Sequence, residues 1–157
     1  MFRSGRDVAE RVSPITVEQI QPNGVDLRLE TVFEPRERGR IGRDGKEIGA
    51  RAPVPPTGED PATFELEPGA YIVRYIERIR IPEDHVGFVL PRSSLLRNGS
   101  MLDTAVWDAG YDGRGEGLLE VHHPIAIERE ARIAQLVLAG AAASGTYDGT
   151  YQGEGVE

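Results

Sequence analysis

Glycine and proline divide the chain into short runs in which apolar and polar residues alternate. There are 19 glycines and 11 prolines among the 157 residues. Alternation over about 5–7 residues is typical of strands that bury one face. The clearest runs are residues 25–29, 70–75, 85–90, 117–122 and 132–138. Because the turn signals recur at regular spacing, we predict an all-β sandwich or barrel and not alternating strand–helix units.

The length of the chain is sufficient for one domain with a single core, so we predict one domain across residues 1–157. Residues 34–61 are rich in charge, glycine and proline and hold few apolar side chains, and we interpret them as a long excursion. The dipeptide Asp44-Gly45 is a turn signal. It predicts the tip of a hairpin within this excursion.

Two segments favour short helices, residues 5–12 near the N-terminus and residues 93–98 after the run that ends at Leu90. The last stretch, residues 139–157, is small and polar. It is either a frayed tail or a flexible arm that closes on another part of the molecule. No glycine-rich loop has the spacing of a Walker A or dinucleotide-binding motif.

The charge of the chain limits its partners. Its formal net charge is −8, so we expect neither nucleic acid nor an anionic membrane surface to bind it. Lys46 is the only lysine, and both a salt-adapted proteome and a GC-rich genome explain this preference for arginine. A polyanionic ligand would have to be bound by a few placed arginines and by backbone N–H groups.

The chain has no cysteine, which excludes disulfides, a thiolate nucleophile and a cysteine-based zinc site. No segment approaches the roughly 18 consecutive apolar residues that would cross a bilayer. The N-terminal residues also lack the apolar core of a secretory signal. We therefore expect a cytoplasmic protein with no membrane partner.

A candidate anion site follows the run that ends at Leu90. Arg92, the hydroxyls of Ser93 and Ser94, and the N–H groups at the start of a helical turn can together bind a negative charge. The alternative is that one serine caps the turn while Arg92 is a surface residue. The residue types alone leave both interpretations open.

Two acidic residues are candidates for proton chemistry. Asp108 lies where an apolar run enters a glycine-rich turn, and it can activate a water, bind a sugar hydroxyl or bond its own backbone. Glu120 lies inside a run, and alternation places it on the face opposite Leu119 and Val121. It either faces water there or, if a pocket buries it, has a raised pKa and moves protons.

The pair His122-His123 resembles a metal site at first sight. Adjacent residues of a strand point to opposite faces, so the two imidazoles cannot easily share one ion. The His-x-Glu and Pro-Cys-x-x-Cys signature of zinc deaminases is absent as well. We predict no metal site made of protein side chains.

Four blocks in order resemble the conserved motifs of trimeric dUTPases and their dCTP deaminase relatives. They are Gly24-Val25-Asp26-Leu27, Pro91-Arg92-Ser93-Ser94-Leu95, Asp108-Ala109-Gly110-Tyr111-Asp112-Gly113 and Arg132-Ile133-Ala134-Gln135-Leu136. The segment Gly149-Thr150-Tyr151-Gln152-Gly153 is similar to the Tyr-Gln-Gly arm of archaeal-type dUTPases and dCTP deaminases. The similarity covers most of the chain after residue 20, except residues 34–61. It is greatest to the dUTPases of salt-loving archaea, which agrees with the acidic, lysine-poor composition.

This resemblance implies a distorted, jelly-roll-like β-barrel assembled as a homotrimer with active sites between subunits. The implied activity is hydrolysis of dUTP to dUMP and pyrophosphate, which supplies dUMP for dTTP synthesis and keeps uracil out of DNA. Mg²⁺ would be the cofactor, chelated mainly by the triphosphate of the substrate.

The resemblance also implies roles for single residues. Arg92, Ser93 and Ser94 would hold the phosphates. The backbone around Ala105 and Val106 would read the pyrimidine edge, where unpaired polar groups are costly.

Further roles concern the sugar, the water and the arm. Tyr111 would pack under the deoxyribose, and Asp108 would bind the 3′-hydroxyl and orient or deprotonate the attacking water. Gln135 would support the site from a neighbouring strand. The C-terminal arm, residues 140–157, would close over the nucleotide with Tyr151 and Gln152.

A dCTP deaminase, alone or in a bifunctional enzyme, is the alternative within this superfamily. There an arginine and a strand glutamate activate a water without metal, and Arg97 and Glu120 occupy those positions. Residues 104–108 are one residue shorter than the deaminase pattern and match dUTPases without a gap, so we favour the diphosphatase. A non-catalytic nucleotide-binding trimer is a remote alternative, disfavoured by the presence of Asp108 and Ser93.

Overall fold

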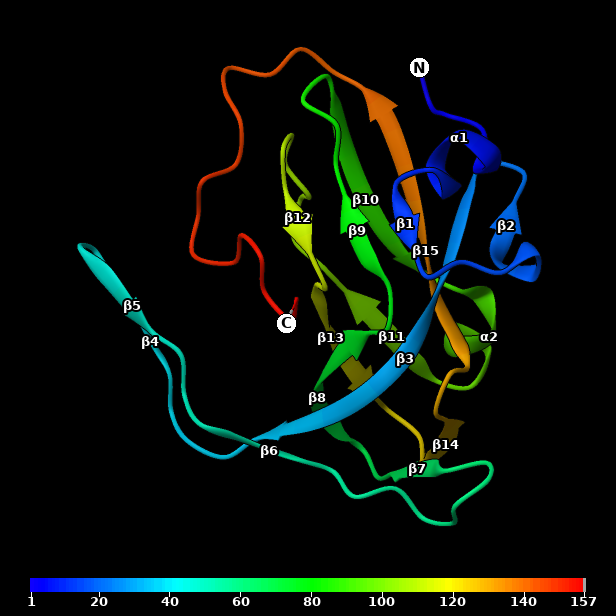
Figure 1. Cartoon of the computed structure of the whole chain (residues 1–157). Coiled ribbons are helices and arrows are strands. Elements are labelled where there is room, and N and C mark those ends of the chain that lie inside the picture. The colour runs from blue at the N-terminus through cyan, green and yellow to red at the C-terminus, as the bar shows by residue number, and fades with distance from the viewer. Residues whose placement is uncertain (157) are drawn as a thin grey trace.

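The computed structural model describes residues 1–156 and consists mainly of one antiparallel sheet that curves into a nearly closed barrel (Figure 1). The strand order along this sheet is β10 (His85–Pro91), β15 (Arg132–Gly140), β3 (Gly24–Pro35), β8 (Gly69–Tyr75), β13 (Glu116–Val121) and β11 (Ser100–Asp103). Two short strands, β2 (Ile20–Gln21) and β6 (Arg51–Pro53), also pair with β3. The expected all-β, jelly-roll-like barrel is confirmed, and the five alternating runs correspond to β3, β8, β10, β13 and β15.

Smaller elements surround this barrel. β9 (Arg78–Arg80) lies between β1 (Val12–Ser13) and β12 (Asp112–Gly113), β7 (Thr63–Leu66) pairs with β14 (Ile125–Glu128), and β4 (Arg40–Gly42) pairs with β5 (Gly45–Glu47). The helical elements are α1 (Gly5–Ala9), the 3-10 turn η1 (Val17–Gln19) and α2 (Ser93–Arg97). None of the helices within residues 1–156 has the length and apolar character needed to span a membrane.

The core is built from the inward-facing residues of the alternating strands. On β3, Val25, Leu27 and Leu29 are fully buried, and on β13 the buried positions include Leu119 and Val121. Burying a side chain of this size stabilises the fold by roughly 1.5–3 kcal/mol. The alternation therefore fixes which face of each strand remains available for a site.

The first predicted helix is shorter than expected. The structure has α1 at Gly5–Ala9, begun by Ser4, whose hydroxyl accepts a 3.3 Å hydrogen bond from the backbone N–H of Asp7. The prediction of a helix through residue 12 was wrong, because Val12 pairs with Ile79 as part of β1. A tertiary strand pairing therefore ends this helix early.

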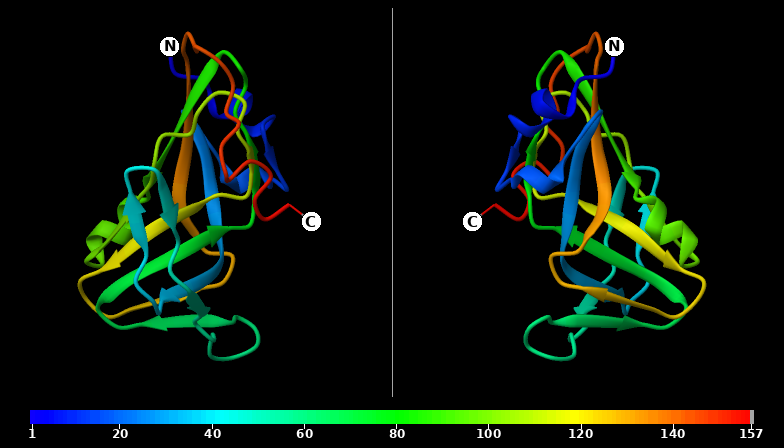
Figure 2. Two further views of the ribbon diagram at one scale, coloured as in Figure 1. Left: turned by 90° about the vertical axis from the view of Figure 1, so that its left-hand side faces the viewer. Right: turned by 90° about the vertical axis from the view of Figure 1, so that its right-hand side faces the viewer.

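The excursion contains the predicted hairpin, with a different tip. Gly42 pairs with Gly45, so Arg43 and Asp44 form the turn, and the predicted tip at Asp44-Gly45 was wrong by one residue. The β4–β5 hairpin projects away from the barrel (Figures 1 and 2). The hairpin therefore faces the barrel across a hollow and forms one of its walls.

Candidate active site

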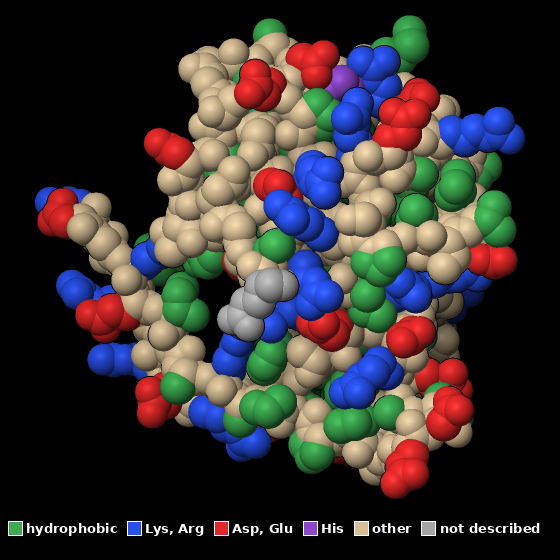
Figure 3. Space-filling model, in the orientation of Figure 1, with side chains coloured by type: hydrophobic (Ala, Val, Ile, Leu, Met, Phe, Trp, Pro, Cys, Tyr) green, Lys and Arg blue, Asp and Glu red, His purple; other side chains and the backbone are tan. Residues whose placement is uncertain are grey.

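The larger cavity of the protein lies between the β4–β5 hairpin and the barrel and has a volume of about 1280 Å³. Figure 3 shows this hollow beside the projecting hairpin. One wall is formed by the hairpin, including Ile41 and Ile48, whose side chains are 94% and 69% exposed. The opposite wall is the segment 103–108 with Tyr111. Such apolar side chains standing free of any core are typical of a surface that meets another molecule.

Backbone pairing fixes the segment that follows β11. The N–H and C=O of Trp107 both bond Gly87, at 3.1 and 2.9 Å. The Thr104 hydroxyl donates to the carbonyl of Val89 at 3.1 Å. Between these anchors Ala105 and Val106 are exposed and line the cavity. A short stretch of exposed backbone held at both ends is suited to reading a flat ligand edge.

Asp108 follows this anchored stretch, and its side chain is exposed at the cavity. Its backbone carbonyl accepts a 3.1 Å hydrogen bond from the N–H of Tyr111, which closes a tight turn. The carboxylate is therefore held on a rigid turn while it remains accessible to water and ligand. This geometry permits both roles that the sequence leaves open, a turn residue and a group that activates water.

Aromatic rings form the floor of the cavity. The ring of Tyr111 packs edge-on against Trp107 and Tyr147, with centroid distances of 5.1 and 5.7 Å. Tyr111 is only 6% exposed, and its hydroxyl donates a 2.9 Å hydrogen bond to Oε1 of Glu154. Burial, with the neighbouring Glu154 carboxylate, raises the pKa of Tyr111 well above its usual value, so the phenol stays protonated.

The segment after β15 crosses the outside of the 109–114 turn and docks on it (Figure 1). Tyr147 donates its backbone N–H to the carbonyl of Ala109 at 2.7 Å. Gly153 donates to Asp112, and Arg114 donates to Glu154, both at 2.8 Å. The structure therefore favours the arm interpretation of the C-terminal stretch over a frayed tail.

Gln152 adds a side-chain clamp to this docking. Its Nε2 donates to the carbonyl of Gly110 at 2.9 Å, and its Oε1 accepts from the backbone N–H of Asp112 at 3.0 Å. The carboxamide thus bonds the turn as a peptide group of a neighbouring strand would. Its neighbour Tyr151 lines the cavity, and the ammonium of Lys46 on β5 lies 4.4 Å from the Tyr151 ring centroid.

Glu116, on β13, lines the cavity and pairs with two arginines. Arg51 forms two hydrogen bonds to its carboxylate, at 2.6 and 2.7 Å, and Arg74 approaches the same group at 3.0 Å. The hydrogen bonds to Glu116 raise the pKa of Arg51. Two guanidinium groups sharing one carboxylate leave a local positive charge next to the docked arm.

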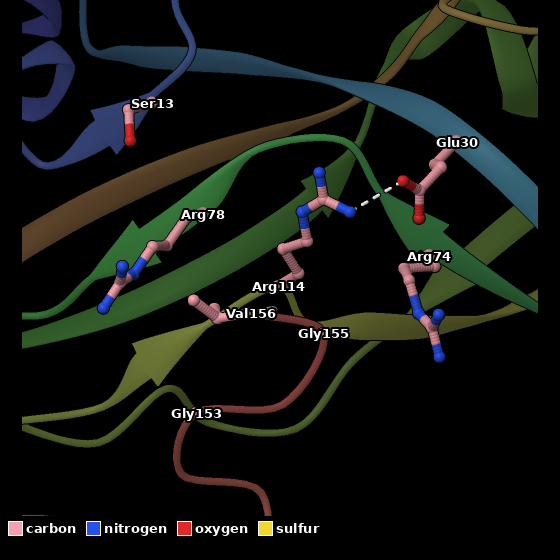
Figure 4. A pocket seen from close by; sticks show the side chains of 8 residues that line it. All are labelled: Ser13, Glu30, Arg74, Arg78, Arg114, Gly153, Gly155 and Val156. Carbon is pink, nitrogen blue, oxygen red and sulfur yellow. Dashed lines mark hydrogen bonds and ion pairs between the residues drawn. The ribbon is translucent and has the colours of Figure 1, made fainter.

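A second, smaller hollow of about 670 Å³ lies under the end of the arm (Figure 4). It is lined by three arginines that come from different strands and loops. Each one pairs with a carboxylate: Arg74 with Glu116, Arg78 with Asp112, and Arg114 with Glu30. Each arginine of this hollow therefore has a carboxylate partner within the protein, and Arg74 shares its partner with Arg51.

The predicted anion site is separate from the larger cavity. Arg92 is the N-cap residue of α2, and Ser93 and Ser94 are exposed in the first turn. The Nε of Arg92 lies 3.4 Å from Oδ2 of the buried Asp26. Arg97, in the last turn of α2, bonds the carbonyl of Ser93 at 3.4 Å. None of these α2 side chains lines the cavity within residues 1–156.

Glu120 lies on the face of β13 that alternation predicts. Leu119 and Val121 point into the core, whereas Glu120 is 44% exposed and lies 3.8 Å from Nε2 of His122. Glu116 and Leu118, on the same face, line the cavity, and Glu120 is the next residue beyond them. Glu120 therefore lies close to the cavity without lining it.

The structure thus divides the predicted site residues into two groups. Ala105, Val106, Asp108, Tyr111 and Tyr151 line one cavity. The predicted residues that do not line it are Arg92, Ser93, Ser94, Arg97, Glu120, Gln135 and Gln152. Tyr147 and Glu154 also line the cavity, and neither was predicted from the sequence. Each stands in a small, polar segment with no periodicity, so no local signal marks them.

No set of three or more His, Cys, Asp and Glu side chains in residues 1–156 is arranged to hold a metal ion. His122 and His123 are both exposed in the turn after β13. A divalent cation at this site would need oxygen ligands from a bound phosphate chain in addition to any carboxylate of the protein.

Comparison with known proteins links this geometry to one family. Residues 3–141 match the family described as dCTP deaminase-like. The "Probable deoxyuridine 5'-triphosphate nucleotidohydrolase" of Halobacterium salinarum is 58% identical over 157 residues, covering 98% of this chain and 95% of that protein. The "Deoxyuridine 5'-triphosphate nucleotidohydrolase" of Methanocaldococcus jannaschii is 40% identical over 139 residues, covering 87% of this chain and 88% of the relative.

Among solved structures, the 2'-deoxycytidine 5'-triphosphate deaminase from Agrobacterium tumefaciens is similar with a TM-score of 0.66. The sequence identity is 20%, and the match covers 87% of this chain. This chain spans about half of that solved chain, of which 47% is covered. At this identity the similarity concerns the fold, and it agrees with the β-barrel described above.

Proposed function

Because the chain belongs to the dCTP deaminase-like family, we propose that it is a dUTP diphosphatase, which hydrolyses dUTP to dUMP and pyrophosphate. The full-length similarity to proteins named deoxyuridine triphosphate nucleotidohydrolases supports this activity. The observation that carries it in the structure is the exposed Asp108, held on a tight turn at a cavity floored by Tyr111. The product dUMP would supply dTTP synthesis, and removal of dUTP would keep uracil out of DNA.

In this proposal the cavity holds the nucleoside. The exposed backbone at Ala105 and Val106 reads the uracil edge, and the deoxyribose packs over Tyr111. A 2′-hydroxyl would have to displace the packed aromatic floor, so the site would favour the deoxy sugar. Asp108 binds the 3′-hydroxyl and orients or deprotonates the water that attacks the α-phosphorus.

The phosphates would be bound by Arg92, Ser93 and Ser94. These residues lie outside the cavity of the same chain, so a neighbouring copy would have to bring them to the nucleotide. We therefore propose a homotrimer with active sites between subunits. Exposed apolar side chains near α2 support such an interface: Phe88 and Leu90 on β10, Leu96 on α2 and Met101 on β11.

Magnesium would reach the site with the triphosphate. The acidic side chains of the cavity within residues 1–156 are not arranged as a metal site, so the oxygen ligands that Mg²⁺ prefers would come mainly from the phosphates and water. When bound, the ion offsets the charge that develops on the phosphate oxygens. Gln135, opposite Asp26 across the β15–β3 pair, would support the phosphate side of the site. The arm of residues 140–157, of which the structure describes 140–156, would cover the nucleotide with Tyr151 and exclude water, while Gln152 clamps it to the turn.

A dCTP deaminase activity is the second candidate. Glu120 lies on the same face of β13 as Glu116 and Leu118, which line the cavity. This observation favours retaining the deaminase as a candidate activity. In that reaction Glu120 would move the protons and Arg97 would help to activate the water. Glu120→Gln would then eliminate deamination and leave the diphosphatase nearly untouched.

The test is a parallel product assay with dUTP and dCTP, each with Mg²⁺, that resolves nucleotides and pyrophosphate at low and high salt. Conversion of dUTP alone to dUMP and pyrophosphate supports the diphosphatase. Conversion of dCTP to dUTP or dUMP supports the deaminase or a bifunctional enzyme. Turnover of neither substrate would contradict both activities and favour a nucleotide-binding module.

A further inference from the structure

Asp26 is a carboxylate buried between two arginines. It lies on β3, is 1% exposed, and its Oδ2 is 3.2 Å from Nη1 of Arg132 and 3.4 Å from Nε of Arg92. Burial raises the pKa of Asp26, while the two guanidinium groups oppose this and favour the charged form. Two partly exposed positive charges therefore converge on one carboxylate that is closed off from solvent.

Strand pairing brings these three residues together. β15 pairs with β3 around Asp26, and the register shifts between Arg132 and Ala134, so a bulge occurs there. β10 pairs with β15 up to Pro91, and the N–H of Arg92 then donates to the carbonyl of Ile133 at 3.0 Å. The backbone of Arg92 is thus fixed, but its long side chain still has to be oriented.

The contacts of Arg92 differ from those of Arg132. Arg132 uses Nη1 for both Asp26 and the carbonyl of Glu18 in the η1 turn, and its side chain is 36% exposed. Arg92 uses Nε for Asp26 and Nη1 for the carbonyl of Arg132 at 3.4 Å, and its side chain remains 33% exposed. Asp26 therefore secures the inner edge of the guanidinium and leaves another part of it accessible beside Ser93.

A buried charge of this kind stabilises a barrel less than apolar packing of similar volume often does. Replacing buried ion pairs with apolar residues is often neutral or stabilising, so such a pair is weak evidence for a role in stability. The nearby Glu77 offers a comparison, because it is fully buried and bonds the backbone N–H and Nε of Arg28 at 2.9 and 2.7 Å. The partner of Glu77, Arg28, is only 16% exposed, whereas the partner of Asp26, Arg92, reaches the surface.

We infer that Asp26 is a positioning residue, which holds the guanidinium of Arg92 next to Ser93 and Ser94 so that all three meet the triphosphate together. This inference rests on the proposed function for the identity of the substrate, but the anion-binding step can be measured alone. An arginine held in advance loses less freedom on binding than one that has to be ordered by the ligand. Asp26 would therefore act on the binding of phosphate groups and not on the binding of the nucleoside.

The test uses Asp26→Asn, Arg92→Gln and the double variant in the full-length protein, with Glu77→Gln as the matched control. Calorimetry measures the binding of inorganic tripolyphosphate with Mg²⁺ and of deoxyuridine, and steady-state kinetics measure dUTP hydrolysis. We expect Asp26→Asn to weaken tripolyphosphate binding and to raise KM by at least about tenfold, because the ion pair that orients the Arg92 guanidinium is lost. Deoxyuridine affinity should stay the same.

In the double variant, Asp26→Asn should add nothing to the loss caused by Arg92→Gln, because the two residues act through one contact. Arg92→Lys provides a further test that leaves the buried residue intact, since lysine keeps the charge but lacks the Nε contact. We expect it to weaken tripolyphosphate binding as Asp26→Asn does. Glu77→Gln should lower the melting temperature without changing tripolyphosphate binding.

Several results would overturn the inference: additive losses in the double variant, wild-type binding by Arg92→Lys, or a loss of deoxyuridine affinity equal to that for tripolyphosphate. The outcome also separates the two proposals. If the wild type binds tripolyphosphate through this pair but does not hydrolyse dUTP, the role of Asp26 stands and the proposed function fails. If the wild type hydrolyses dUTP and Asp26→Asn does so equally well, only the role of Asp26 fails.

Discussion

The hydroxyl of Tyr111, on the floor of the cavity, donates a 2.9 Å hydrogen bond to Glu154 of the C-terminal segment. The two residues are 43 positions apart, so the contact exists only when this segment is docked. Arg114 binds the backbone of the same residue, through a 2.8 Å hydrogen bond to its carbonyl. Glu154 therefore joins the C-terminal segment to the residue that we propose packs under the sugar.

The first prediction is that arm docking depends on pH through Glu154. Burial, chiefly, and the neighbouring Glu116 raise the pKa of Glu154 in the docked state. A group whose docked pKa lies above its free value favours docking most at low pH, and this contribution is lost as pH rises through the docked pKa. Glu154→Gln should remove this dependence, because the amide oxygen still accepts from Tyr111 without becoming charged.

Hydrogen exchange at the backbone N–H groups of Gly153 and Arg114 measures this docking directly. Across mildly acidic to neutral pH, after correction for the intrinsic exchange rate, protection should fall in the wild type and stay flat in Glu154→Gln. Asp148→Asn is the control, since Asp148 is an exposed acid on the same segment. A falling profile in Glu154→Gln like that of the wild type would assign the pH effect to another group.

The second prediction concerns Gln152, whose carboxamide makes two hydrogen bonds to the turn at Gly110 and Asp112. Each such bond contributes about 1 kcal/mol or less at an exposed site, so Gln152→Ala should weaken docking several-fold. We expect a higher KM for dUTP and faster cleavage of the arm by a protease. Thr150→Ala, at an exposed neighbouring position, should match the wild type. Unchanged protease sensitivity in Gln152→Ala would show that the backbone contacts alone hold the arm.

The third prediction tests the proposed base. Asp108→Asn keeps the shape of the turn but removes the charge, so it should lower kcat for dUTP by about 10²–10⁴-fold, the usual contribution of general acid–base catalysis. Binding of dUMP, measured by calorimetry, should change far less. Asp103→Asn is the comparison, because Asp103 also lines the cavity. Wild-type turnover by Asp108→Asn, or an equal loss in Asp103→Asn, would remove the assigned role.

The barrel strands could be predicted because each carries its own signal. On β3 the alternation of Val25, Leu27 and Leu29 with polar residues places one face in the core, and no distant residue is needed to see this. The early end of α1 could not be foreseen, because Val12 is recruited by Ile79 from another part of the chain. Local pattern predicts elements, whereas tertiary pairing sets where they end.

Some parts of the candidate site could be predicted from the sequence and others could not. The segment that holds Asp108 and Tyr111 could be found because a turn follows an apolar run and resembles a known motif. The contacts of Tyr147 and Glu154 could not, since they join a polar tail to a turn about 40 residues away in sequence. The separation of Arg92 from the cavity was equally hidden, because it depends on which side of the barrel α2 lies.

The last prediction uses Trp107, the only tryptophan of the chain. Gly115 lies against its ring, and a Cβ at position 115 would be 2.0 Å from Cη2, far inside van der Waals contact. Trp107 is 7% exposed and is paired through its backbone with Gly87, so the ring cannot shift without disturbing the packing around it. Gly115→Ala should therefore displace the ring and strain the 104–108 segment, which we propose reads the base.

Overpacking of this kind costs roughly 1–3 kcal/mol, so the melting temperature of Gly115→Ala should fall by several degrees. The tryptophan fluorescence should shift to longer wavelength as the ring becomes exposed, and KM for dUTP should rise. Gly45→Ala is the matched control, since a Cβ at Gly45 would have no neighbour within 4 Å. If Gly115→Ala kept the wild-type fluorescence and KM, the packing of Trp107 on Gly115 would have no part in shaping the cavity.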